Sequence, residues 1–196
     1  MNAMSHRERV RLALNHQEPD YVPIDLGAGR ATTTYPTPYR EAAKILKIDV
    51  EPLTVSRRNV LDDFREEFLQ ALDIDFRRVK LRYPRELQSF EAGQKQYDEW
   101  VIPWVENDGF WTPHEPPLKN AGLADLDSFI WPEPITDSYT EGVREEAEYK
   151  YRNTDYALVA CLPHHCYGVQ TTSYFLRGLD NFMIDLMENK EFVHKL

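Results

Sequence analysis

The chain has 196 residues, of which 42% are hydrophobic and 12% aromatic, a composition typical of a globular domain with a sizeable core. The formal net charge is −10, from 33 acidic and 23 interspersed basic residues, which argues against nucleic-acid binding because phosphate contacts need concentrated positive charge. No apolar run approaches the ~20 residues that span a bilayer, and two cysteines are too few for a disulfide framework, so we expect a cytoplasmic protein without membrane contact.

The beginning of the chain predicts a helix, a strand and a turn. Ser5 and Glu8 have the spacing of a capping box, and apolar residues then recur at helical spacing before Pro19 ends the helix. Residues 22–26 are typical of a short strand, and they lead into the turn at residues 27–29.

Two helices and a second strand follow. Thr37 and Pro38 predict a helix start, with Thr37 as the N-cap, and that helix runs to about Leu46. Apolar residues on one face predict a helix over residues 61–72, whose acidic residues then form a solvated face. Residues 76–81 are typical of a strand, and we interpret their basic side chains as a solvated edge.

Residues 84–118 differ from the rest, because aromatic residues alternate there with polar ones around Asn107, Asp108 and Gly109. This pattern predicts antiparallel hairpins, and we interpret the segment as an insertion over one end of the main fold. The remaining elements are predicted as helices near 123–129 and over 141–151, 167–177 and 181–187, a buried strand over 156–161, and a last helix from about 190.

Candidate parallel strands separated by helices predict an α/β fold, a TIM (β/α)8 barrel, which typically needs about 250 residues. The last helix carries no stop signal. We therefore expect residues 1–196 to be the N-terminal half of one barrel domain, with the insertion at about 84–118.

Active sites of such barrels form at the C-terminal ends of the strands, and the first such end is the corner at residues 25–30. Its glycines allow backbone to approach a ligand, and Arg30 can hold a carboxylate with its planar fork, so Asp25 and Arg30 are candidate substrate-binding residues. The alternative is a simple tight turn with an exposed arginine.

The third predicted strand ends in a cluster of polar residues. His164 and Cys166 have a spacing that can hold zinc, but no second ligand cluster accompanies them. A histidine there can instead contact substrate, and packing is a further alternative. Cys161 is expected in the core. Tyr174, in the following helix, is a candidate hydrogen-bond donor at the barrel mouth, or a packed tyrosine with a wet hydroxyl.

The sequence resembles the uroporphyrinogen decarboxylase superfamily, which includes corrinoid-dependent methyltransferases. The resemblance covers most of the chain, and the matching segments in order are residues 5–20, 22–27, 71–77, 97–100, 131–134 and 175–178. It implies a (β/α)8 barrel, a carboxylate-binding role for Arg30, and a substrate hydrogen bond from Tyr174 as the catalytic residue.

The two branches of this superfamily imply different chemistry. Decarboxylases use no cofactor, but the aspartate expected after their second strand is replaced here by residues 79–82, and one arginine of their early motif is missing. Methyltransferases imply a corrinoid partner protein and zinc held in the second half of the barrel, so the role is not transferred to His164 and Cys166.

We therefore expect an enzyme fragment, a methyltransferase-like member acting on a small methylated or anionic substrate. Its expected partners are the remaining half of the barrel, a corrinoid protein and a second copy in a homodimer. An authentic uroporphyrinogen decarboxylase is the alternative, and a non-catalytic half-barrel interaction module is the alternative of another class.

Overall fold

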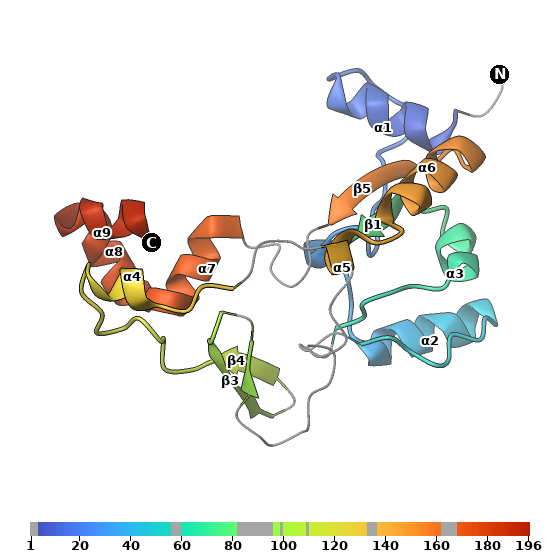
Figure 1. Ribbon diagram of the computed structural model, residues 1–196. Helices are drawn as coiled ribbons and strands as arrows, with labels where there is room; N and C mark the ends of the chain where they lie inside the picture. Colours follow the sequence, from blue (N-terminus) through green and yellow to red (C-terminus); the bar gives the residue numbers. More distant parts are fainter. Residues whose placement is uncertain are drawn as a thin grey trace. The chain divides into compact units, whose positions relative to one another are not determined.

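The computed structural model describes residues 4–55, 60–81, 96–98, 100–108, 110–132, 137–161 and 168–196. The chain divides into two compact units (Figure 1). The first comprises Met1–Arg82 and Asp137–Cys166, and the second comprises Tyr83–Thr136 and Tyr167–Leu196. Among the described residues, the helices are too short and too polar for any of them to cross a membrane.

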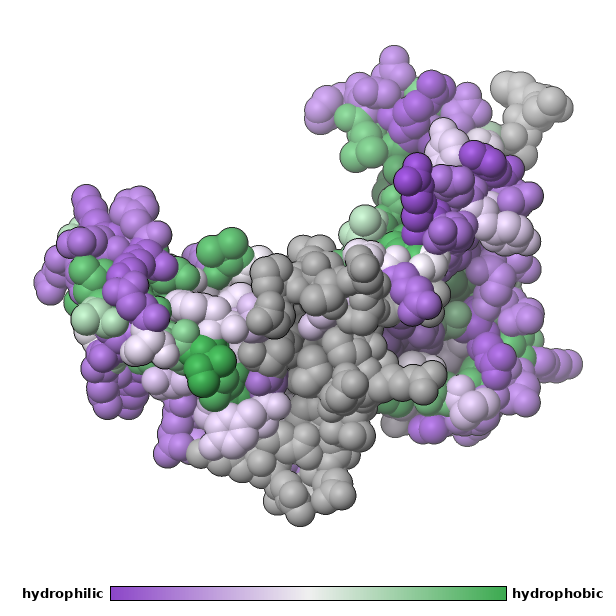
Figure 2. Space-filling view, in the orientation of Figure 1, coloured by the Kyte–Doolittle hydropathy of each residue, from purple (hydrophilic) through white to green (hydrophobic). Residues whose placement is uncertain are grey.

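The first unit combines helices with a parallel pair of strands. Its elements are α1 (His6–Leu14), the 3-10 helix η1 (Arg30–Thr32), α2 (Pro36–Leu46), α3 (Glu66–Ala71), β1 (Phe76–Lys80), α5 (Asp137–Thr140), α6 (Val143–Asn153) and β5 (Ala157–Cys161). Figure 2 shows mainly hydrophilic surface over α1 and α6.

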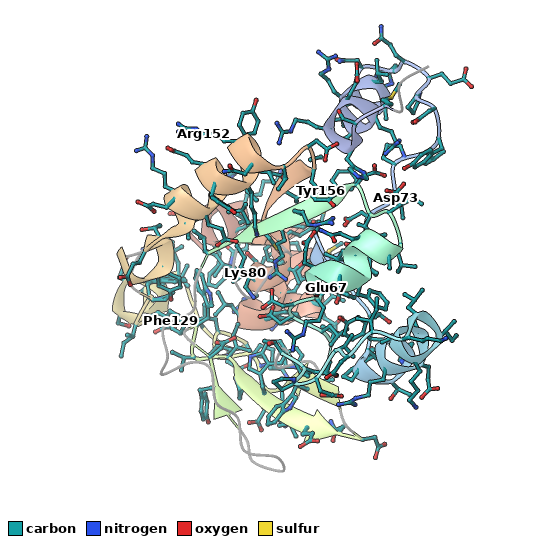
Figure 3. All side chains as sticks on the ribbon, turned by 90° about the vertical axis from the view of Figure 1, so that its right-hand side faces the viewer. Glu67, Asp73, Lys80, Phe129, Arg152 and Tyr156 are labelled. Atoms are coloured by element: carbon teal, nitrogen blue, oxygen red, sulfur yellow. The ribbon has the colours of Figure 1, made fainter. Side chains whose placement is uncertain are left out.

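Strands β1 and β5 pair in parallel, from Phe76 beside Ala157 to Lys80 beside Cys161, which confirms both predicted strands. The Asp75 carbonyl accepts from the Ala157 N–H, and the Leu81 N–H donates to the Cys161 carbonyl. Because ladder bonds of a parallel strand involve every second residue, the backbone groups of Phe76, Arg78 and Lys80 face the other edge of β1. Figure 3 shows Asp73 and Tyr156 near the starts of these strands and Lys80 farther along.

The strand predicted over residues 22–26 is wrong. The Asp75 N–H donates to the Ile24 carbonyl, but the Ile24 N–H donates to the Asp75 carboxylate, 2.7 Å away, instead of to a backbone carbonyl. Pro23 has no N–H to offer. The segment therefore lies beside the start of β1 without forming a ladder.

The predicted helix boundaries hold in part. Ser5 accepts from the Glu8 N–H at 3.3 Å, which confirms the cap of α1. Helix α2 ends at Leu46 as expected but begins at Pro36, because this proline also suits the first helical turn. The helix predicted over 61–72 is confined to α3, since the backbone of Leu61 pairs with Val55 in an isolated bridge.

The core of the first unit surrounds Tyr39, whose ring is 2% exposed and meets the rings of Phe64 and Phe68 edge-on. Its hydroxyl accepts from the Arg65 N–H at 3.0 Å. Burial raises the pKa of Tyr39 above its ordinary value. The hydrogen bond from Arg65 to Tyr39 joins helix α2 to the segment before α3. Cys161 is buried, as expected.

The second unit consists of an antiparallel sheet and short helices. Its elements are β2 (Gln96–Tyr97), β3 (Pro103–Asn107), β4 (Phe110–Pro113), α4 (Asp125–Ser128), α7 (Gly168–Arg177), α8 (Leu179–Glu188) and α9 (Lys190–Lys195). Strands β3 and β4 pair from Trp104 beside Pro113 to Asn107 beside Phe110, which confirms the predicted hairpin. The helices predicted in this region lie within two residues of those observed.

Two structural side chains connect the elements of the second unit. Asp98 is buried and accepts from the backbone N–H groups of Trp100 and Ile102 and from the indole of Trp104, at 2.8–2.9 Å. Arg177 donates to the carbonyls of Leu118 and Ala121, each 2.8 Å away. It also pairs with Asp185 at 2.7 Å and lies over the ring of Phe192.

We predict that Asp98→Ala destabilises the protein by at least about 2 kcal/mol, because it leaves buried N–H donors without an acceptor. Urea denaturation followed by tryptophan fluorescence measures this effect. Asp127→Ala is the matched control, since Asp127 is exposed and paired only at the surface with Lys195. Equal midpoints for the two variants would contradict the role assigned to Asp98.

Candidate functional site

The residues predicted to carry function are distributed over both units. Asp25 and Arg30 belong to the first unit and Tyr174 to the second. His164 and Cys166 lie outside the described residues. The shared cavity expected for Arg30 and Tyr174 stays a prediction.

Asp25 shapes the predicted corner. Its carboxylate accepts from the Ala28 N–H at 3.1 Å, and the Gly27 N–H donates to the Thr32 carbonyl at 3.0 Å. The corner is therefore held by hydrogen bonds within residues 25–32. It leads directly into η1, which begins at Arg30.

The two glycines of this corner have different roles. Gly27 has a φ of +82°, and an added Cβ would lie 2.4 Å from the ring of Phe64. Gly29 has a φ of −112°, and an added Cβ would approach only the Thr32 hydroxyl, at 3.6 Å. The turn therefore needs glycine at position 27 for both backbone conformation and close packing.

A small pocket of about 100 Å³, partly open to solvent, lies beside this corner within the first unit. It is smaller than the roughly 300–1,000 Å³ of a typical ligand pocket, so it can hold only a small chemical group. Its apolar lining includes Phe64 and Phe76, and its acidic and basic lining comes from the segment before α3, from α3, from β1 and from α6. The full lining is Leu26, Gly27, Ala28, Asp62, Asp63, Phe64, Glu66, Leu69, Phe76, Arg77, Arg78 and Lys150.

The charged side chains of this pocket are paired with one another or with neighbours. Lys80 bridges Asp62 and Asp63 at 2.8 Å each, and Arg77 binds Glu66 at 2.8 Å. Lys150 pairs with Glu146 at 2.6 Å and also donates to the Arg78 carbonyl on the free edge of β1. The solvated basic edge interpreted from the sequence is wrong, because Arg77 is buried and Arg78 and Lys80 are partly buried in ion pairs. The solvated acidic face is confirmed in part, since Asp63, Glu66 and Glu67 are exposed while Asp62 is partly buried.

Asp62 is the most strongly perturbed of these carboxyl groups. Burial raises its pKa, but the hydrogen bond from Lys80 and the charges of Lys80 and Arg78 together outweigh burial and lower the pKa below 3.8. Asp62 is therefore ionised at neutral pH. It serves as a fixed acceptor and not as a proton donor.

Arg78 is the one incompletely satisfied group in this wall. Its Nη1 donates to the Asp62 carbonyl at 2.8 Å, and its Nη2 lies 3.4 Å from the Asp62 carboxylate. Its Nε is buried and has no hydrogen-bond acceptor among the described residues. Buried donors in folded proteins nearly always have a partner, which can be water or a ligand.

Tyr174 has contacts typical of a packed tyrosine. Its hydroxyl accepts from Gln170 one turn earlier in α7, and its ring meets Phe182 of α8 edge-on at 5.2 Å. These contacts belong to the packing of α7 on α8. The role of Tyr174 as a hydrogen-bond donor to substrate stays a prediction.

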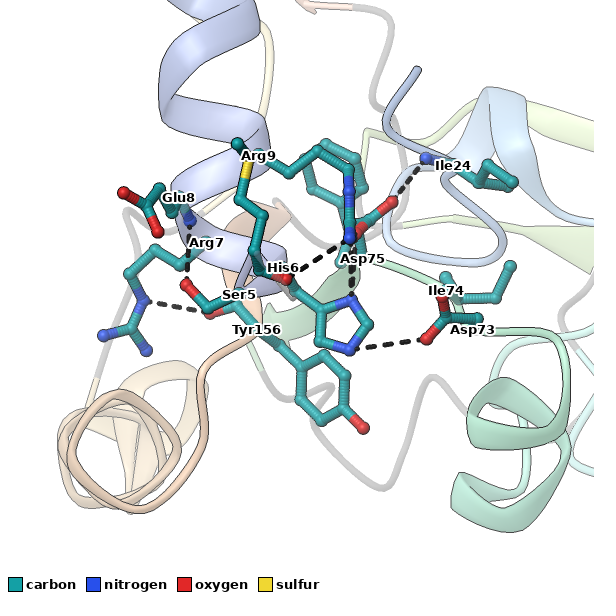
Figure 4. A network of polar contacts seen from close by, with 12 residues as sticks. Ser5, His6, Arg7, Glu8, Arg9, Ile24, Asp73, Ile74, Asp75 and Tyr156 are labelled. Atoms are coloured by element: carbon teal, nitrogen blue, oxygen red, sulfur yellow. Dashed lines mark hydrogen bonds and ion pairs between the residues drawn. The ribbon is translucent and has the colours of Figure 1, made fainter. Parts of the chain in front are cut away.

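A second polar cluster, which the sequence reasoning missed, joins α1 to the start of β1 (Figure 4). The Asp75 carboxylate is fully buried and accepts from Arg9, from His6 at 2.9 Å and from the Ile24 N–H at 2.7 Å. Arg9, 4% exposed, also pairs with Asp20 at 2.6 Å. The hydrogen bond to Asp20 raises the pKa of Arg9, against the effect of burial. We call these residues the N-terminal clamp.

The histidine of the clamp is held on three sides. His6 Nδ1 faces Asp75, its Nε2 lies 3.6 Å from Asp73, and its ring lies 4.7 Å from that of Tyr156. A histidine between carboxylates can serve acid–base chemistry. However, the Asp75 carboxylate is fully buried and both of its oxygens are occupied by donors from this unit. We therefore assign the clamp to structure and take the pocket as the candidate site.

Searches against family models, curated proteins and solved structures found no match. In the part of the chain that the structure describes, no group of three or more His, Cys, Asp or Glu residues is placed to hold a metal ion. The chemistry of the pocket therefore has to be argued from its own residues.

We predict that Asp75→Asn costs about 3 kcal/mol or more, because it removes the buried one of the two counter-charges of the Arg9 guanidinium and places an amide among donors. Equilibrium urea unfolding tests this expectation. Glu41→Gln removes one charge of an exposed pair with Lys44 and should leave the midpoint nearly unchanged. If Asp75→Asn is as mild as this control, the clamp does not hold the fold.

We also predict that Gly27→Ala destabilises the protein by about 1–3 kcal/mol, whereas Gly29→Ala is nearly neutral. The reason is the positive φ at position 27 and the overlap of the new methyl group with Phe64. Thermal unfolding of the two variants measures the difference. A neutral Gly27→Ala would show that the corner can adopt another conformation.

Proposed function

We propose that this chain forms part of an α/β-barrel enzyme of the uroporphyrinogen decarboxylase superfamily, in a methyltransferase-like branch, and that the pocket beside Gly27 belongs to its substrate site. The observation that carries the proposal is that the predicted corner lines a pocket together with the first three residues of β1. The corner follows the segment that takes the place of a first barrel strand, and barrel sites form at the carboxyl ends of strands.

The parallel pairing of β1 and β5 supports the barrel. Parallel strands need a crossover connection, usually with a helix, and α6, which precedes β5, contacts both strands. The segment before the corner also lies beside β1, through the hydrogen bonds between Ile24 and Asp75. This arrangement has the chain order of three successive barrel strands, although the first of them forms no ladder.

The pocket favours a small methylated substrate over uroporphyrinogen. A volume of about 100 Å³ is far too small for a tetrapyrrole and admits only a small group.

In this proposal the residues of the chain bind and orient the substrate. The rings of Phe64 and Phe76 hold its apolar part, and the paired charges present donors and acceptors in fixed positions. The described residues offer no zinc site, so no step is assigned to zinc or to a corrinoid, and both stay predictions. Arg30 and Tyr174 keep their predicted roles.

One observation favours the non-catalytic alternative. Leu179, Met183 and Met187 recur every four residues along α8 and are 50–79% exposed, which makes an apolar stripe on one face of that helix. Exposed apolar surface of this kind is used for protein contacts. A non-catalytic interaction module would use this stripe to bind its partner, and the pocket would then have no function.

We predict that the protein, supplied with a corrinoid protein, transfers a methyl group from a small methyl ether or methylamine to a thiol. The C–O or C–N bond breaks, the S–CH3 bond forms, and the released alcohol or amine takes up the thiol proton. We also predict that the protein releases no carbon dioxide from uroporphyrinogen. Mass spectrometry of the S-methyl product and a carbon dioxide assay measure the two activities. Gly27→Ala should lower methyl transfer, and Gly29→Ala should not.

The outcomes separate the candidate functions. Carbon dioxide release from uroporphyrinogen would contradict the methyltransferase branch and support the decarboxylase. Failure of both reactions, together with self-association that a charged residue at Met183 abolishes, would support the interaction module.

A further inference from the structure

Helix α8 of the second unit has an exposed apolar face that the pocket of the first unit does not explain. Its apolar stripe consists of Leu179, Met183 and Met187, which are 53%, 50% and 79% exposed. Because residues four apart lie one above the other on a helix, the three side chains form a continuous row along α8.

The opposite face of α8 attaches the helix to its own unit. Phe182 and Asp185 are buried, and Asp185 pairs with Arg177 of α7 at 2.7 Å. With 3.6 residues per turn, positions 182 and 185 lie on the side of α8 that is turned away from the stripe. The packing of the unit therefore uses one face of α8 and leaves the stripe exposed.

A second row of side chains, beside the stripe, is acidic at both ends. It consists of Asp180, Ile184 and Glu188, which are again four residues apart and are all exposed. In the part of the chain that the structure describes, neither Asp180 nor Glu188 has an ion-pair partner. Helix α8 contains no lysine or arginine. The exposed surface of α8 is therefore apolar along its length and negatively charged along one flank.

These two properties determine which kind of partner fits. An apolar helix face accepts the apolar face of another amphipathic helix, and the flexible thioethers of methionine adapt to differently shaped anchors. Unpaired carboxylates on the flank attract lysine or arginine of the partner and repel acidic residues. A second copy of this chain fits less well, because it presents the same carboxylates and the same net charge of −10.

We propose that α8 is a docking surface for a basic amphipathic helix of a partner protein. The apolar side chains of that helix pack on the stripe, and its lysine or arginine residues pair with Asp180 and Glu188. A helix of ten residues spans roughly 15 Å, which is short for a permanent interface, so we expect a transient complex. The inference goes beyond the proposed function and does not depend on it, because the stripe and the pocket belong to different units.

Synthetic peptides of about 18 residues, long enough to form a helix, serve as probes. The first has leucine at every third or fourth position and lysine on its other face, the second has glutamate in place of lysine, and the third is a scrambled version of the first. We expect the first peptide to shift the backbone amide resonances of α8 in a ¹H–¹⁵N NMR titration. It should bind at least about tenfold more tightly than the other two, since only it combines an apolar face with positive charge.

Two pairs of variants separate the apolar contribution from the charge. Met183→Gln makes the centre of the stripe polar and should weaken binding of the first peptide by about tenfold, whereas Ile45→Gln, at an apolar position of α2 that is 82% exposed, should not. Glu188→Gln should weaken binding about two- to fivefold at low salt. Glu145→Gln makes the same chemical change at an exposed position of α6 and should have no effect. All four positions are exposed, so the substitutions should leave the fold intact.

The unfavourable outcomes overturn the proposal. Equal binding of the three peptides would do so, as would a Met183→Gln variant as mild as Ile45→Gln or a Glu188→Gln variant as mild as Glu145→Gln. Dimerisation in analytical ultracentrifugation that Met183→Gln abolishes, without peptide binding, would assign the stripe to a second copy. Methyl transfer without peptide binding would reject this inference alone, and peptide binding without methyl transfer would reject the proposed function alone.

Discussion

The buried ion pair between Arg9 and Asp75 is the constraint on which the first unit depends. Asp75 precedes β1, Arg9 lies in α1, and the chain between them is held through Asp20 and Ile24. Two buried charges are tolerated only when each is paired and hydrogen-bonded, and here every oxygen of Asp75 has a donor. This ion pair fixes the position at which β1 begins. Strand β1 in turn supplies Arg77 and Arg78 to the wall of the pocket.

The segments that carry the family resemblance are also those that supply such connecting residues. Arg9 and Asp75 lie in the first and third of these segments, Asp98 in the fourth and Arg177 in the last. Each of these side chains binds several partners within its unit. These segments therefore include residues that maintain architecture. They cover only part of the pocket, because Gly27 and Arg77 lie inside them and Arg78 and Lys150 lie outside.

Local patterns predicted much of the fold, because a buried strand or a hairpin is encoded by adjacent residues. Both strands of the parallel pair, the β3–β4 hairpin and the helices near the end of the chain follow from such patterns. The strand predicted over 22–26 does not form, because the Ile24 N–H donates to the Asp75 carboxylate and not to a backbone carbonyl of a neighbouring strand. The pocket could not be predicted either. Most of its ion pairs join residues far apart in the sequence, such as Asp62 and Arg78, and runs of like charge give no sign of their partners.

The paired charges beside the corner connect its folding with the wall of the pocket. Asp62 and Asp63 are held against β1 by Arg78 and Lys80, and the neighbouring Phe64 fills the space that Gly27 leaves open. The same contacts therefore position the corner and fix the plane of the Arg78 guanidinium. Because Asp62 and Arg78 are far apart in the sequence, a local pattern of charges shows neither partner, and only the fold brings them together.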